Sequence, residues 1–299
     1  MTTYSATGTL TPNPPFDFDK SLGFLGSFAP SEGEQALSAR NLAKAVLING
    51  QMVVFQIAAA GSVEAPRLDY TLHSDRPIGD ATRRAAEDRI AFFLGLEDDL
   101  RPFYAIGLAD PPFAPVVGQL YGYHQVKFLT PFENACWAVL TQRNPIQLAK
   151  RTKQALVERF GASLELGGQR YWAFPEAACL AAADTSVLFE LTSNQRRAEY
   201  LCAVARAFSQ ADEAWLRAAP YAEAEAWLRA IKGFGAWSAT FVLLRGLGRM
   251  ERAPIGEARL AEAAARRYGC ALGEAAILEI ASRYQQWQGY WAHYLRVAG

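Results

Sequence analysis

The chain has 299 residues and no formal net charge at neutral pH. Hydrophobic residues make up 51% of it and charged residues 20%, which is typical of a globular protein with a sizeable core in one large domain or two ordinary ones. No apolar run reaches the roughly 18 residues that span a membrane, and the N-terminus lacks the basic and apolar segments of a secretory signal.

The first part of the chain predicts a mixture of helices and strands. Residues 31–45 and 81–94 have the pattern of helices, and Asp80 is placed to cap the second of them. Residues 52–61 (MVVFQIAAAG) and 67–74 (RLDYTLHS) are rich in β-branched and aromatic residues and end in turn residues, as strands do. We therefore expect a small antiparallel sheet accompanied by helices.

The second part predicts helices alone. Three prolines between positions 111 and 115 indicate a linker, and strand signals disappear from about Pro131 onward. Nine later segments carry apolar residues at helical spacing, and Gly161 and Gly269 stand where helix C-caps are expected. The fold class is therefore α+β, with a mixed α/β domain over residues 1–115 and an all-helical bundle over residues 116–299.

Charge and cysteine content narrow the function. Residues 1–119 carry a net charge of −5 and residues 120–299 a net charge of +5, so a polyanion is expected to meet the second part, although ordinary scatter of surface charge could give the same difference. The four cysteines (Cys136, Cys179, Cys202 and Cys270) form no CxxC pair, so neither a zinc site nor an iron–sulfur cluster is indicated. Scattered thiols favour a reducing cytoplasm, and we expect no cofactor.

Residues 228–240 (LRAIKGFGAWSAT) interrupt a helical pattern. Gly233 and Gly235 flank Phe234, although a glycine costs a helix interior about 1 kcal/mol relative to alanine. This predicts a helical hairpin whose second helix begins near Ala236, with Phe234 packed inward. The free N–H groups at that helix start are suited to an anion such as a phosphate. A glycine turn with a purely structural role is the alternative.

The hairpin carries a family resemblance. Leu228, Ile231, Gly233, Phe234 and Gly235 match the pattern L-x-x-[apolar]-x-G-[apolar]-G of the helix-hairpin-helix (HhH-GPD) superfamily of DNA glycosylases. The blocks TPFENACWAVLTQ, YWAFPEAACLAAA, NQRRAEYLCAVARAF and WQGYWAHYL also resemble that superfamily and follow in its order. The resemblance is closest to the DNA-3-methyladenine glycosylase II branch. It covers nearly the whole chain, including a small sheet domain around PPFDFDKSLGFLGSFAP.

This resemblance implies a base-excision-repair enzyme. It implies a monomer that binds double-stranded DNA containing a damaged, specifically alkylated, base and acts in the bacterial cytoplasm at the nucleoid, without a membrane. In the family the hairpin amides hold a DNA phosphate, often through a monovalent cation at the hairpin carbonyls, and the target base is extruded into a pocket. The hairpin residues are Lys232, Gly233, Phe234, Gly235 and Ala236. No other metal is expected.

The match to the catalytic carboxylate of the family depends on the alignment. The family places an aspartate about two dozen residues after the first hairpin glycine, and an ungapped count reaches Glu257. Glutamate keeps the charge that stabilises a sugar cation, but its extra methylene could move the carboxylate by about 1 Å. Alignment on Pro254 instead reaches Gly256, with Glu251 as the nearby carboxylate. A further alternative is that Glu257 is a solvated residue favoured by the helix dipole.

Other positions carry over by the same resemblance. Gln142, Arg143 and Asn144 lie where the family has paired glutamines and a wedge residue, although Arg143 could equally be a surface arginine. The remaining assignments concern the base pocket, for which we expect Trp137, Trp237 and Phe241. Aromatic faces attract a cationic alkylated base, and plain core packing is the alternative for each.

Two substitutions set limits on the activity. Trp237 occupies the position at which backbone-cutting branches carry a lysine, so a monofunctional hydrolase is expected. An amine from Lys127, Lys150 or Lys153 is the route by which a lyase step could still occur. Arg296 replaces the aromatic residue that the family has near the C-terminal end. A protein that binds damaged DNA without hydrolysing it is the alternative function, and the stretch ERAPIGEARL separates the two.

Overall fold

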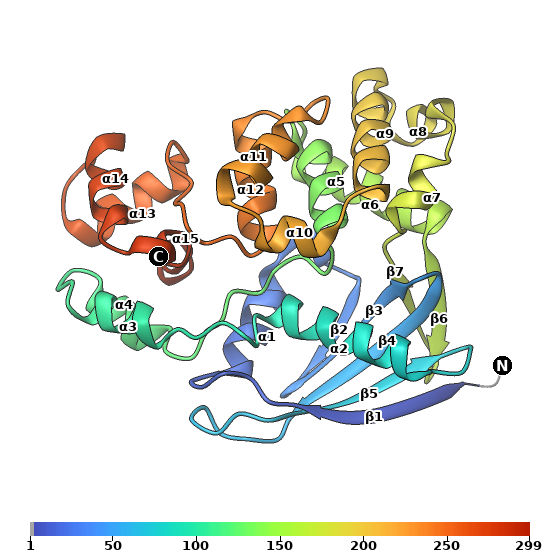
Figure 1. The fold of residues 1–299 in the computed structure, drawn as a ribbon, viewed down its shortest axis with the longest axis horizontal. Helices are drawn as coiled ribbons and strands as arrows, with labels where there is room; N and C mark the ends of the chain where they lie inside the picture. The colour runs from blue at the N-terminus through green and yellow to red at the C-terminus, as the bar shows by residue number, and fades with distance from the viewer. Residues whose placement is uncertain (1–2) are drawn as a thin grey trace.

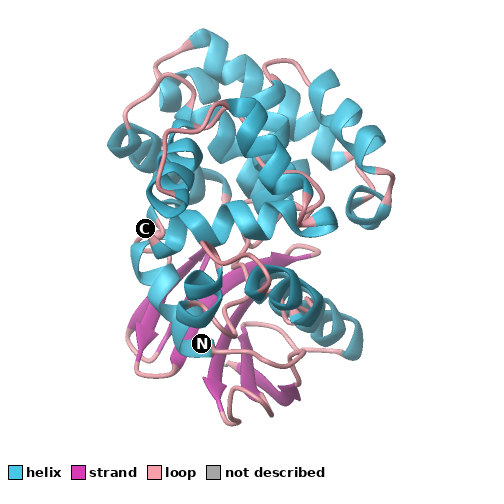
Figure 2. Cartoon of the chain, turned by 90° about the vertical axis from the view of Figure 1, so that its left-hand side faces the viewer, coloured by secondary structure: helices cyan, strands magenta, loops and turns pink. Residues whose placement is uncertain are grey.

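A computed structural model describes residues 3–299 as a five-stranded sheet on one side of a larger helical part (Figures 1 and 2). The sheet is antiparallel throughout, in the order β1-β5-β4-β3-β2. Its strands are β1 (Tyr4–Leu10), β2 (Gln35–Ser38), β3 (Asn41–Ile48), β4 (Gln51–Ala59) and β5 (Leu68–Ser74). The helices of this part are α1 (Phe18–Ser27), α2 (Asp80–Leu94), α3 (Arg101–Leu108) and α4 (Ala114–Gln119).

The predicted helix over residues 31–45 is wrong, because this segment forms β2 and β3. Its alanines, leucines and charged residues have helical propensity, but β3 pairs with β4 along its whole length, and pairing of this kind overrides local preference. Arg40, in a left-handed conformation at φ 60°, makes the turn between the two strands. Both faces of β3 are covered, so its buried residues do not alternate with exposed ones.

Strand structure does not end at Pro131 as the sequence predicts. Strands β6 (Ala162–Leu166) and β7 (Gln169–Ala173) form a hairpin that lies beside β3 (Figure 1). Gly167 and Gly168 make its two-residue turn with φ of 60° and 80°, the conformation that such hairpin turns require. A Gly-Gly pair between two segments of alternating residues is typical of a β-hairpin, so the sequence contained a signal for this one. The α+β fold class is confirmed, with this hairpin as an addition to its helical part.

The remaining helices follow the predicted segments. They are α5 (Pro131–Thr141), α6 (Ile146–Phe160), α7 (Ala177–Ala181), α8 (Thr185–Thr192), α9 (Gln195–Ser209), α10 (Glu213–Ala218), α11 (Tyr221–Ala230), α12 (Ala236–Gly246), α13 (Ala258–Tyr268), α14 (Glu274–Ser282) and α15 (Gln288–Ala298). Local chemistry sets several ends: Gly269 is a left-handed C-cap of α13, whereas Gly161 follows α6 in an extended conformation. Gly79, and not Asp80, is the N-cap of α2.

Two hydrophobic cores group the helices differently from the two domains that the sequence predicts. One core joins the sheet and α1–α4 to the C-terminal helices α13–α15, and Figure 1 shows α3 and α4 beside these helices. The second core is built from residues 128–247. The domain boundary between residues 115 and 116 therefore stays a prediction. No helix within residues 3–299 has both the length and the apolar character needed to span a bilayer.

Candidate functional site

The glycine hairpin has the predicted form. Helix α11 ends before it and α12 begins at Ala236, directly after the turn. Gly233 has φ 95°, and a Cβ there would lie 2.4 Å from the ring of Tyr200, so only glycine is accommodated. Gly235 is the N-cap of α12, its position faces open space, and no side chain caps the helix. The first amides of α12 are thus available to an external acceptor.

The hairpin borders a surface hollow of about 530 Å³, which we call the hairpin hollow. Its lining includes Gly233, Gly235 and three arginines, Arg143, Arg196 and Arg197, and no carboxylate. Asn194 caps α9 by accepting a hydrogen bond from the Arg197 amide, which fixes the arginines in the first turn of that helix. Positive side chains and free helix amides together favour an anion here.

The predicted wedge residues differ in what they do. Gln142 Nε2 donates to the Gly233 carbonyl at 2.9 Å and to Ser238 Oγ at 3.2 Å, which ties this loop to the hairpin. Asn144 donates to the Leu140 carbonyl at the end of α5. Arg143 is exposed and left-handed at φ 47°, an uncommon conformation for a residue other than glycine. Of the three, Arg143 is therefore the one that projects.

The other hairpin residues have structural contacts. Phe234 is buried in the helical core, as predicted. Lys232 is exposed and donates to Glu199 at 2.8 Å. The Gly233 carbonyl accepts one hydrogen bond from Gln142, and the monovalent cation that the resemblance implies at the hairpin carbonyls stays a prediction. Residues 3–299 contain no group of His, Cys, Asp or Glu side chains that could hold a metal ion.

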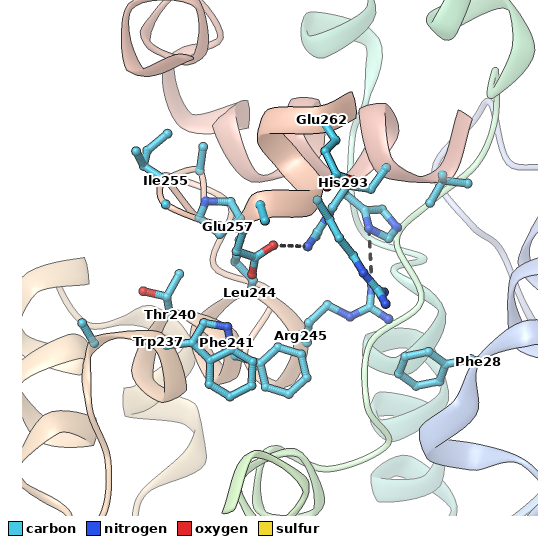
Figure 3. A pocket seen from close by; sticks show the side chains of 18 of the residues that line it. Phe28, Trp237, Thr240, Phe241, Leu244, Arg245, Ile255, Glu257, Glu262 and His293 are labelled. Atoms are coloured by element: carbon cyan, nitrogen blue, oxygen red, sulfur yellow. Dashed lines mark hydrogen bonds and ion pairs between the residues drawn. The ribbon is translucent and has the colours of Figure 1, made fainter. Parts of the chain in front are cut away.

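A second, larger depression lies on the other side of Trp237. This base cavity, as we call it, has a volume of about 1120 Å³ and is lined from α1, α12, α13, α15 and the segment before α13 (Figure 3). Trp237 and Phe241 stack with ring centroids 5.2 Å apart and planes 6° apart, and Trp237 is 48% exposed. Trp137 is 4% exposed and lies in the helical core, so its assignment to the pocket is corrected.

Glu257 reaches the base cavity from the N-cap position of α13. Its carboxylate accepts a hydrogen bond from Arg296 Nη1 at 2.6 Å, an ion pair that is drawn in Figure 3. Gly256 also lines the cavity, but its φ of 90° favours glycine over any residue with a carboxylate. Glu251 pairs with Arg249 at 2.6 Å and is absent from the lining. Glu257 is thus the carboxylate that the geometry favours, with Glu262 exposed one turn further along α13.

Several residues of the cavity were not predicted from the sequence, among them two aromatic and two basic side chains. Phe24 and Phe28 come from α1, more than 200 positions before α12, and no local signal connects them to the hairpin. His293 lies in the matched block WQGYWAHYL, where no local pattern marks it as a site residue. Arg245 is a charged residue in the apolar run FVLLRGL, and that contrast was a usable signal.

Burial controls the ionisation of the polar pair in the cavity. Burial lowers the pKa of Arg245 to about 10, which leaves it charged at neutral pH. Burial also lowers the pKa of His293 well below its ordinary value, and the neighbouring Arg245 and Arg296 lower it further. His293 is therefore neutral at physiological pH.

The three lysines considered for a lyase step lie outside the base cavity. Lys153 is buried between Glu133 and Glu34, each at 2.6 Å. Lys127 pairs with Asp98, and Lys150 pairs with Glu32. None of the three, and no other lysine, is in the lining of the base cavity.

Known proteins share this fold. No family model matches the chain. The DNA-3-methyladenine glycosylase of Bacillus subtilis (strain 168) is 28% identical over 284 residues, which cover 94% of this chain and 93% of that protein. Among solved structures, the 3-methyladenine DNA glycosylase of Archaeoglobus fulgidus superimposes with a TM-score of 0.78 at 20% identity, covering 97% of each chain. The 8-oxoguanine glycosylase/lyase of Clostridium acetobutylicum gives a TM-score of 0.68 at 15% identity, covering 98% of this chain and 97% of that one.

The sheet, the helical part and the glycine hairpin give the chain the fold of these solved DNA glycosylases. It is similar over almost its whole length to a DNA-3-methyladenine glycosylase.

Proposed function

We propose that the protein is a DNA glycosylase of base-excision repair that hydrolyses the N-glycosidic bond of an alkylated base. The observation that carries this proposal is the position of Glu257. Its carboxylate opens into a cavity walled by Trp237 and Phe241, and Trp237 also borders the hairpin hollow. One aromatic residue thus joins a site for phosphate to a site for a base.

The chemistry follows from charge. Departure of a base leaves positive charge on the deoxyribose, and a carboxylate held beside it lowers the barrier. Arg296 fixes the Glu257 carboxylate through an ion pair with both side chains about one-fifth exposed. The stacked pair of Trp237 and Phe241 provides a flat apolar wall for the extruded base, and cationic alkylated bases are attracted to such a surface.

The DNA is held by the hairpin hollow. The amides at the start of α12 are proposed to donate to one phosphate, and Arg196 and Arg197 to neighbouring phosphates. Such contacts position the duplex without reading its sequence. Arg143, exposed at the tip of the adjoining loop, is the proposed wedge that fills the gap left by the extruded base.

We further propose that the enzyme has no lyase step. A Schiff base needs a neutral amine beside the sugar, and Trp237 occupies the position of the family's lysine. Lys127, Lys150 and Lys153 are engaged in ion pairs outside the cavity, as described above. The alternative, a binding protein without hydrolysis, is not favoured, because the Glu257 carboxylate in the lining of the cavity supports hydrolysis.

One experiment tests both the hydrolysis of the N-glycosidic bond and the absence of a lyase step. Duplexes bearing a panel of alkylated and oxidised bases are incubated with the protein, and abasic sites are revealed by alkaline cleavage. We expect strand breaks at alkylated bases after alkali and none before it, with no covalent adduct trapped by borohydride. Binding of damaged duplexes without release of any base would favour the alternative function. Breaks before alkali would contradict the absence of a lyase step.

A further inference from the structure

The base cavity contains an arginine that the proposed mechanism does not use. Arg245 is 5% exposed and lies over the rings of Phe24 and Phe28, 4.9 Å and 5.0 Å from their centroids. Its Nη1 is 3.5 Å from Nδ1 of His293, and its buried Nη2 has no hydrogen-bond partner among residues 3–299. The charged neighbours that affect its pKa include no carboxylate.

A buried guanidinium without a counterion is costly, and structural arginines are normally paired. Arg245 is nevertheless held in one orientation. The two phenylalanine rings contact its guanidinium, and neutral His293, whose Nε2 is 3.0 Å from the Tyr123 hydroxyl, is positioned to accept from it through Nδ1. A fixed donor that the protein itself does not satisfy is suited to an acceptor on a ligand.

The position of Arg245 indicates which part of a ligand it would meet. In Figure 3, Arg245 and His293 lie on the Phe28 side of the cavity, whereas Glu257 and Thr240 lie on the side of Trp237. A base that stacks on the aromatic wall with its sugar near Glu257 therefore presents its far edge toward Arg245.

We propose that Arg245 determines specificity by donating to a carbonyl oxygen on the edge of the extruded base, so that the cavity prefers 6-oxopurines to 6-aminopurines. This inference rests on the proposed function and names its substrate class. A guanidinium can only donate hydrogen bonds, and the amino group of an adenine derivative at that position also donates, so the two repel each other. A 6-oxo group accepts the bond. A base that accepts this hydrogen bond is expected to be preferred over a base that cannot by about 10- to 100-fold.

Duplex DNA methylated with dimethyl sulfate contains both test bases, 7-methylguanine and 3-methyladenine. Both are alkylated purines that carry positive charge as nucleosides, and they differ at position 6. Their release is measured by chromatography from one reaction, for the wild type and for Arg245→Met, which keeps the length and removes the donors. We expect the ratio of released 7-methylguanine to 3-methyladenine to fall about 10-fold in the variant. Release of 3-methyladenine should change by less than about threefold.

Two controls separate specificity from structure. Arg259→Met removes an exposed arginine at the rim of the same cavity and should leave the ratio unchanged. Affinity for a duplex with a stable abasic-site analogue, which offers no base to Arg245, should be the same in Arg245→Met and the wild type. A parallel loss of both released bases, with the ratio unchanged, overturns the proposal and makes Arg245 a structural residue.

A second measurement does not depend on hydrolysis. Equilibrium dialysis compares the affinity of the free bases 7-methylguanine and 3-methyladenine for the wild type and for Arg245→Met. We expect the wild type to prefer 7-methylguanine and the variant to lose that preference. Equal affinities in the wild type overturn the proposal, even if the protein hydrolyses nothing. If the wild type prefers 7-methylguanine in dialysis but releases no base from DNA, the result counts against the proposed function and not against the role of Arg245.

Discussion

The hairpin hollow and the base cavity share Trp237 but are built in opposite ways. The hollow depends on backbone amides at the start of α12, on two glycines and on arginines set by the cap of α9. The base cavity depends on side chains from four helices, of which α1 lies about 200 positions before the other three. The difference shows that a site for phosphate can be encoded in a short segment, because every backbone has amides, whereas a site for a base requires a particular set of side chains.

The largest effect is expected in the base cavity. Glu257→Gln keeps the size of the side chain and removes the charge that stabilises the sugar cation. Release of the base should slow by about a hundredfold to a thousandfold, while affinity for duplex DNA containing an abasic analogue is retained. Single-turnover assays of base release measure the first quantity, and fluorescence anisotropy measures the second.

Glu251→Gln is the matched control, because Glu251 is nearby but pairs with Arg249 outside the lining. Its rate of base release should equal that of the wild type. If Glu251→Gln lost activity and Glu257→Gln kept it, the assignment of the catalytic carboxylate would have to be exchanged. Glu257→Asp, which restores the residue of the family, should remain active if the backbone places the shorter side chain correctly.

The hairpin offers two glycines that should respond differently. Gly233→Ala should lower the free energy of unfolding by about 1–3 kcal/mol, because φ is 95° and the new Cβ meets the Tyr200 ring. Gly235→Ala has space for its Cβ and should fold normally, but the methyl group enters the hollow and should weaken DNA binding. Urea unfolding and anisotropy distinguish the two. Unchanged DNA affinity in folded Gly235→Ala would remove the hairpin from the binding site.

Acid should destabilise the protein through the histidine of the cavity. The pKa of His293 is lowered by burial and by two arginines, so below pH about 6.5 the unfolded chain binds a proton that the folded protein does not. The free energy of unfolding should therefore fall as the pH falls, by up to about 1.4 kcal/mol per pH unit for this group.

His293→Gln should reduce the slope of the unfolding free energy against pH by the amount that corresponds to the uptake of about one proton. His73 and His124, whose pKa values are also lowered by burial, remain in both proteins, so the difference between the two slopes isolates His293. Urea denaturation at several pH values between 5 and 8 provides the measurement. Identical slopes would mean that His293 is protonated in the folded protein.

The smallest effect concerns the link between the wedge loop and the hairpin. Gln142→Ala removes two hydrogen bonds, to the Gly233 carbonyl and to Ser238, and should cost about 1 kcal/mol of stability. Arg143 should then be less well placed, and extrusion of a fluorescent base analogue should be slower. Gln147→Ala, on the exposed surface of α6, is the control. Equal extrusion rates would show that the loop is positioned without Gln142.

The sequence by itself determined the fold class, the helices after Pro131 and the glycine hairpin. These features depend on local properties: helical spacing of apolar residues, positive φ at Gly233 and free amides at a helix start. It failed for residues 31–45, where strand pairing outweighed helical propensity, and for the β6–β7 hairpin, which interrupts the helices after Pro131. It also failed for Trp137, which lies in the helical core. Periodicity alone does not say which face of a helix meets a core and which meets a cavity.

Only the tertiary structure decided the composition of the base cavity. Counting from Gly233 led to Glu257, but the choice over Gly256 and Glu251 came from the conformation of Gly256 and the partner of Glu251. Arg245 became notable when folding brought α1 and α15 against α12 and left its guanidinium without a counterion. A missing partner is a property of three-dimensional surroundings, because burial and pairing involve residues that the chain places hundreds of positions apart.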